Sequence, residues 1–181
     1  MVRRTREDAL ATREQLLDAA QRVFREKGVG HTSLAEVADA AGVTRGAIYW
    51  HFRSKAELFK AMVERAELPM DAALEELADA AHEDPLGQAR DLALRALRHL
   101  AASERTRAVF DIVFLRCEYT AELLPVQEQH LKERALCINR CAEAFRRAVK
   151  KGQLPADTDV GLASRGLYAF VGGLMRDAVE S

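Results

Sequence analysis

Residues 33–55 read SLAEVADAAGVTRGAIYWHFRSK, and their pattern is the most informative one in the N-terminal part of the chain. Ser33 and Glu36 have the spacing of a capping box, in which each side chain bonds a backbone amide at a helix start. Gly42 ends that short helix, and Thr44 is a suitable N-cap for a second one. Two short helices joined by a tight glycine turn form a helix-turn-helix.

The sequence on both sides of this stretch has the helical period almost throughout. Apolar residues recur three and four positions apart over residues 8–27, which predicts a helix that ends at Gly28. A second capping pair, Ser54 with Glu57, opens a helix that we expect to run to about residue 80. Further helices are expected over residues 85–102, 103–119, 125–151 and from 160 onward. With no strand of consequence expected, the fold class is all-α.

The composition of the 181-residue chain fits one or two helical domains. Hydrophobic residues make up 49% and charged residues 30%, which is too apolar for an intrinsically disordered chain. Residues 1–60 carry 11 Lys and Arg against 8 Asp and Glu, whereas the remainder carries 16 against 20. We therefore expect a basic three-helix unit over residues 1–52 and a larger helical body over residues 53–181.

The second helix of the helix-turn-helix is a candidate for reading DNA. Such a helix enters the major groove with its N-terminal residues against the base edges, where Thr44 and Arg45 lie, and an arginine can donate a bidentate pair to guanine. The small Gly46 lets the backbone approach DNA closely. The polar and aromatic residues that follow suit contacts to the phosphates and complete the candidate set: Tyr49, Trp50, His51 and Lys55.

The residues of this region match a known family. The segment GVTRGAIYWHFRSKAELF closely resembles the recognition-helix segment of TetR-type transcriptional regulators, and TREQLLDAAQRVFREKGVGHTSLAEVADAAG fits the same pattern. The segments FLRCEYTAELLPVQEQ and VKKGQLPADTDVGLASRGLYAFVGGLM resemble the ligand-domain segments of AcrR-like repressors of multidrug efflux pumps.

This resemblance implies an architecture and a mechanism. TetR-type regulators are all-α homodimers with an N-terminal DNA-binding domain and a C-terminal domain for ligand binding and dimerisation. Ligand binding would move the helix expected over residues 55–80, which releases a palindromic operator because the two recognition helices change their separation. The family's phosphate contacts also fall on Thr32 and Ser33.

The ligand site is expected in the larger helical body. Adaptable methionines and aromatic rings suit planar or cationic compounds, and Glu67 aligns with an acid that sits in the drug pocket of AcrR-like proteins. Glu118 and Gln127 are candidates for polar contacts. The apolar candidates are Met62, Met70, Phe110 and Phe114.

Other functions are weighed against this one. The sequence has none of the patterns GxSxG, GxxxxGK[ST] and HExxH, and no GxGxxG after a strand, so we expect no enzyme and no cofactor. Three cysteines and five scattered histidines predict free thiols and no metal site. Without a membrane span or signal peptide, the protein is expected in the cytoplasm. The alternatives are a TetR-type repressor for a narrow metabolic ligand and a helical interaction module that does not bind DNA.

Overall fold

The computed structural model describes residues 6–66, 70–79 and 81–181, without the side chains of residues 70 and 71. These residues form helices and connecting turns and contain no strand, which confirms the all-α class. None of the helices in this described part is long and apolar enough to cross a membrane. The chain divides into two compact units, one of residues 1–67 with 108–127 and one of residues 68–107 with 128–181. The expected boundary after residue 52 stays a prediction.

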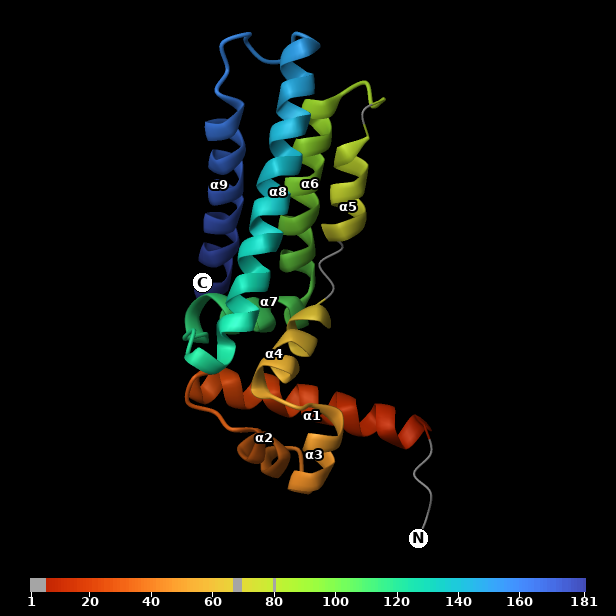
Figure 1. Cartoon of the computed structure of the whole chain (residues 1–181), viewed down its shortest axis with the longest axis vertical. Helices are drawn as coiled ribbons and strands as arrows, with labels where there is room; N and C mark the ends of the chain where they lie inside the picture. The colour runs from red at the N-terminus through yellow and green to blue at the C-terminus, as the bar shows by residue number, and fades with distance from the viewer. Residues whose placement is uncertain (1–5, 67–69, 80) are drawn as a thin grey trace. The chain divides into compact units, whose positions relative to one another are not determined.

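The first unit packs its helices around a core that the helical period places on one face of each. Figure 1 shows α2 and α3 next to each other on one side of α1. The helices of this unit are α1 (Arg6–Lys27), α2 (Leu34–Ala40), α3 (Arg45–His51) and α4 (Lys55–Glu64), followed later by the π-helix η1 (Ile112–Arg116) and the 3-10 helix η2 (Ala121–Leu123). The largest fully buried side chains are Leu16, Leu17, Phe24, Val29, Ile48, Phe52, Leu58, Met62, Ile112 and Leu123.

The short helices start and stop where the sequence predicts. Ser33 and Thr44 are the N-caps of α2 and α3, and Ser33 with Glu36 forms the full capping box. Gly42 has a φ of 69°, a left-handed conformation that glycine adopts without the steric cost of a side chain. At Ser54 only half of the expected box forms, because the Glu57 carboxylate accepts from the amide of Arg53 at 2.8 Å.

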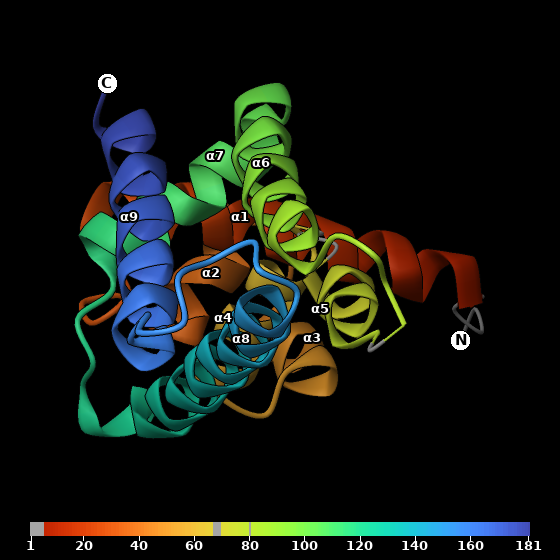
Figure 2. The same ribbon diagram turned by 90° about the horizontal axis from the view of Figure 1, so that it is seen from above.

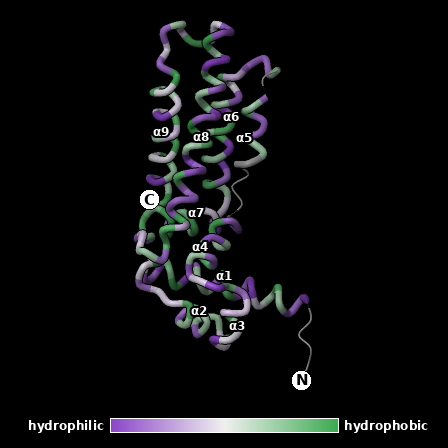
Figure 3. Tube along the Cα trace, viewed as in Figure 1, coloured by the Kyte–Doolittle hydropathy of each residue, from purple (hydrophilic) through white to green (hydrophobic). Residues whose placement is uncertain are grey.

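The second unit is an assembly of longer amphipathic helices. It contains α5 (Met70–Ala78), α6 (Pro85–Ala102), most of α8 (Leu124–Lys150) and α9 (Val160–Glu180), while α7 (Glu104–Asp111) leads back to the first unit. Figures 1 and 2 show α5 beside α6, and Figure 3 shows hydrophilic and hydrophobic residues alternating along α6, α8 and α9. The core of this unit joins Leu77, Ala89, Leu92, Ala144 and Phe145.

The single helix expected over residues 55–80 is wrong, because α4 ends at Glu64 and α5 begins at Met70. Pro69 stands between them in the sequence. Proline has no amide hydrogen for the bond to residue i−4 and disfavours helical conformation in the residue before it. After α4, the guanidinium of Arg65 lies 2.7 Å from Asp18 and 3.1 Å from Glu14 of α1, which anchors the end of α4.

Candidate nucleic-acid interface

The helix α3 buries one side and exposes the rest. Ile48 is fully buried and faces the core of the first unit. Arg45 and the backbone at Gly46 are exposed, and the side chains of Tyr49 and Trp50 are 57% and 73% exposed. Neighbouring exposed apolar side chains that form a patch often mark an interaction site. The exposed side of α3 therefore has the character of a binding surface.

The orientation of α3 is fixed at its C-terminal end. Phe52 is buried, and the guanidinium of Arg13 lies 5.3 Å above the centre of its ring, which is a cation–π contact. The rings of Trp50 and His51 meet edge to face, with 4.6 Å between their centres. The Arg13–Phe52 contact holds the end of α3 against α1, while Arg45 in its N-terminal turn stays exposed.

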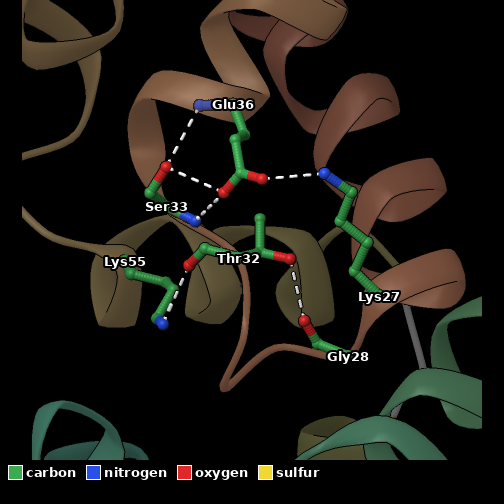
Figure 4. Close-up of polar contacts among 6 residues, drawn as sticks. All are labelled: Lys27, Gly28, Thr32, Ser33, Glu36 and Lys55. Atoms are coloured by element: carbon green, nitrogen blue, oxygen red, sulfur yellow. Dashed lines mark hydrogen bonds and ion pairs between the residues drawn. The ribbon is translucent and has the colours of Figure 1, made fainter.

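A network of charged and polar groups fixes the start of α2 (Figure 4). The Ser33 hydroxyl and amide each donate to Glu36 Oε2 at 2.9 Å, and the Glu36 amide donates back to Ser33 Oγ at 3.3 Å. Lys27 Nζ at the end of α1 donates to Glu36 Oε1 at 2.7 Å. The ammonium of Lys27 and the two Ser33 bonds lower the pKa of Glu36 to about 2. The hydrogen bond to the Glu36 carboxylate in turn raises the pKa of Lys27.

Two of the residues predicted to touch phosphate are held inside the protein. The Thr32 side chain is buried and its hydroxyl donates to the Gly28 carbonyl at 2.8 Å. The side chain of Lys55 is only 7% exposed. Its Nζ donates to the carbonyls of Thr32 at 2.9 Å and Gly30 at 3.2 Å, and it lies 3.3 Å from Glu122 Oε2. That Thr32 and Lys55 contact DNA stays a prediction.

A cavity of about 480 Å³ opens between the start of α2, the end of α3 and the start of α4. Its lining includes four of the predicted DNA contacts, together with polar residues that the helix-turn-helix motif alone does not identify. Arg53 is one of these residues. The sequence feature that could have identified it is a cation directly before Ser54, the N-cap of α4. Ser54 and Lys55 at the N-terminus of α4 line the cavity, and the positive end of a helix dipole favours an anion. The lining residues are Gly30, His31, Thr32, Ser33, Leu34, Glu36, Tyr49, Arg53, Ser54, Lys55 and Glu122.

None of the predicted ligand contacts among the described residues lines this cavity. Phe110 and Phe114 pack together with 5.4 Å between ring centres, and both are half-buried. Met62 is fully buried in the core of the first unit, Glu118 is exposed, and Gln127 is half-buried.

Two further candidate contacts, Glu67 and the side chain of Met70, lie outside the described residues. No group of three or more His, Cys, Asp or Glu that could hold a metal ion occurs in the part of the chain that the structure describes. Nothing in the described residues tests the predicted ligand contacts, so the ligand set stays a prediction.

Comparison with known proteins decides what this interface belongs to. Residues 16–62 match the model of the bacterial regulatory proteins of the tetR family, and residues 84–179 match that of the C-terminal region of MAATS-type transcriptional repressors. The chain belongs to the TetR family. It is thus a member of a family of DNA-binding transcriptional regulators, and α2 and α3 are the helix-turn-helix of this TetR-family protein.

Several relatives match along nearly the whole chain. The transcriptional regulator TtgR of Pseudomonas putida is 39% identical over 97% of this chain and 84% of its own, and AcrR of Shigella flexneri is 36% identical over 98% and 82%. The crystal structure of NalD, the secondary repressor of the MexAB-OprM multidrug efflux pump in Pseudomonas aeruginosa, is 40% identical with a TM-score of 0.87. It covers 97% of this chain and 87% of its own.

Proposed function

We propose that this TetR-family protein is a homodimeric repressor of a multidrug efflux pump operon in the cytoplasm. It leaves a palindromic operator when a small, often cationic or aromatic, compound binds the C-terminal domain. The exposed side of α3, next to a polar cavity at the start of α4, is the observation that carries the DNA-binding part. The efflux part is supported by relatives such as NalD and AcrR.

In this proposal base edges and phosphates meet different residues. Thr44 and Arg45 at the open N-terminal turn of α3 face the bases, and the backbone at Gly46 approaches the groove. A phosphate sits in the cavity, against the amides at the start of α4, the Tyr49 hydroxyl and the Arg53 guanidinium. The cavity has the right chemistry for a phosphate because helix amides and a guanidinium both favour anions.

The dimer is proposed to form through α8 and α9. From residue 128 onward α8 belongs to the second unit together with α9, and both helices expose large apolar side chains there that a monomer would leave in water. On α9 a Cβ at Gly166, Gly172 or Gly173 would meet no atom within 4 Å, so this helix has room for close approach by another helix. The exposed apolar side chains in this unit are Leu131 and Leu136 on α8 and Leu162, Phe170 and Leu174 on α9.

The effector is proposed to bind among the apolar residues of the C-terminal domain. The structure of a SmeT–triclosan complex, 36% identical to this chain, shows that a relative of this chain binds a small aromatic compound. Within the predicted set, Phe110 and Phe114 are in ring contact with each other, in the segment that packs with the first unit. Effector binding acts on DNA affinity only by favouring one of two arrangements of the dimer.

The test is a fluorescence-anisotropy titration of the purified protein against a duplex from upstream of its own gene. A random duplex of the same length is the control, and ethidium is the probe compound. We expect the protein to bind its own duplex more tightly than the random duplex, and ethidium to weaken this binding. The signal of ethidium with DNA in the absence of protein is subtracted from each titration. Selective binding that no cationic compound weakens would favour the narrow metabolic ligand, and equal binding to both duplexes would contradict the proposal.

A further inference from the structure

A short acidic segment, residues 116–123, packs against the DNA-binding elements of the first unit. The amide of Val29, in the loop between α1 and α2, donates to the Arg116 carbonyl at 2.9 Å. A Cβ at Gly30 would lie 3.0 Å from Glu118 Oε2, so the loop and the segment approach closely there. Chain continuity joins the end of this segment to α8, which runs on into the second unit.

The segment places one carboxylate on the lysine at the start of α4. Glu122 Oε2 lies 3.3 Å from Lys55 Nζ, and Glu122 also lines the cavity. The Lys55 ammonium has three N–H donors. Two of them are used by the Gly30 and Thr32 carbonyls, so Glu122 takes the third.

The charges around the cavity show which cation Glu122 neutralises. The carboxylate of Glu36 is already paired with Lys27 and bonded to Ser33, whereas Arg53 is an exposed cation of the lining. Glu122 is the acid that neutralises the other lining cation, Lys55. The Lys55 side chain would remain anchored by its two carbonyl acceptors if Glu122 lost its charge. Its third N–H would then face an anion in the cavity.

We propose that Glu122 holds the third N–H of Lys55 away from an operator phosphate, so that segment 116–123 limits DNA affinity through one ion pair. This inference rests on the proposed DNA-binding function and names a control of the same site. A shift of the segment that parts Glu122 from Lys55 turns the lysine from an internal anchor into a phosphate contact. DNA affinity then rises because a charge-assisted hydrogen bond is added.

The experiment compares four variants by anisotropy titrations at several salt concentrations: wild type, Glu122→Gln, Lys55→Met, and both together. We expect Glu122→Gln to bind the selected duplex about tenfold more tightly, because a neutral amide oxygen is a weaker acceptor than a carboxylate and a phosphate can take the third Lys55 N–H from it. The slope of log K against log salt should steepen by about 0.9, the value for one further phosphate contact. In the Lys55→Met background the Glu122→Gln change should have little effect.

Two controls separate this mechanism from others. Glu64→Gln removes the same charge from an exposed pair with Lys60 at the other end of α4, and we expect less than about a twofold change. Circular dichroism melts show that each variant is folded. Equal or weaker binding by Glu122→Gln, or a gain that persists in Lys55→Met, would overturn the inference. A wild type without selective binding would instead refute the proposed function, and the inference with it.

Discussion

Glu36 shows how one side chain prepares the DNA-binding surface. Its folded pKa of about 2 lies below the ordinary value of 4.5, because Lys27 and Ser33 stabilise the carboxylate. A lowered pKa means that the stabilisation is complete above pH 4.5 and is lost as the pH falls toward 2. We predict that Glu36→Gln lowers the melting temperature at pH 7, and that the difference from wild type shrinks between pH 4.5 and 2.

The comparison uses thermal melts of both proteins over that pH range, with Glu64→Gln as the variant that loses only an exposed pair with Lys60. A Glu36→Gln difference of the same size at pH 2 and pH 7 would mean that the ionised network is not what stabilises α2.

Arg45 and Arg53 are both exposed cations, but the proposal gives them different partners. Arg45 at the start of α3 would read a base, so Arg45→Ala should reduce discrimination at one base pair by about 1–3 kcal/mol. Arg53 lines the cavity and would meet a phosphate, so Arg53→Ala should weaken all duplexes alike and flatten the salt slope by about 0.9. Titrations against single-base variants of the operator at two salt concentrations distinguish them. If both variants lose affinity uniformly, the assignment of Arg45 to a base is wrong.

At the scale of elements, local chemistry was enough to place most of the helices. The caps at Ser33, Thr44, Asp84 and Asp159 are short-range patterns, because each cap side chain bonds an amide only three residues later in the sequence. The site was less predictable, because Lys55 looks like a free cation at a helix start. Its burial depends on Glu122, 67 residues away in the sequence, and on two carbonyls of the α1–α2 loop.

At Gly46 of α3, we expect protein stability and DNA binding to favour different residues. A Cβ there would have its nearest atom at 3.9 Å, on the cap residue Thr44, so alanine fits. Alanine is the better helix former, and Gly46→Ala should raise stability by roughly 0.5–1 kcal/mol. The same methyl group would stand between the helix backbone and DNA. We predict a higher melting temperature with weaker operator binding, measured on one preparation. Unchanged or tighter binding would show that this turn of α3 does not approach DNA closely.

The whole molecule shows an arrangement that helix prediction alone does not reach. Residues 108–127 belong to the same unit as α1 to α4, although α5 and α6 come between them in the sequence. Local periodicity predicts that α7 and α8 exist, but long-range burial of residues such as Val109, Ile112 and Leu123 decides where the chain returns. The family resemblance supplied the DNA-binding role, whereas the pairing of segment 116–123 with the DNA-binding elements required the structure.

The proposed dimer is the property of the whole molecule that a single substitution can test. Phe170 on α9 is 65% exposed, and a symmetric dimer would bury two copies of it. Burying one phenylalanine contributes about 1.5–3 kcal/mol. We therefore predict that Phe170→Glu raises the dimer Kd at least about a hundredfold, roughly 3 kcal/mol, in sedimentation velocity experiments over a range of concentrations.

Leu10→Glu is the matched control, because Leu10 is 57% exposed but lies on α1, outside the proposed dimer face. Since each half of a palindrome needs its own recognition helix, operator binding should weaken in parallel with dimerisation. A Phe170→Glu protein that stays dimeric at the same concentrations as wild type would place the dimer contact elsewhere.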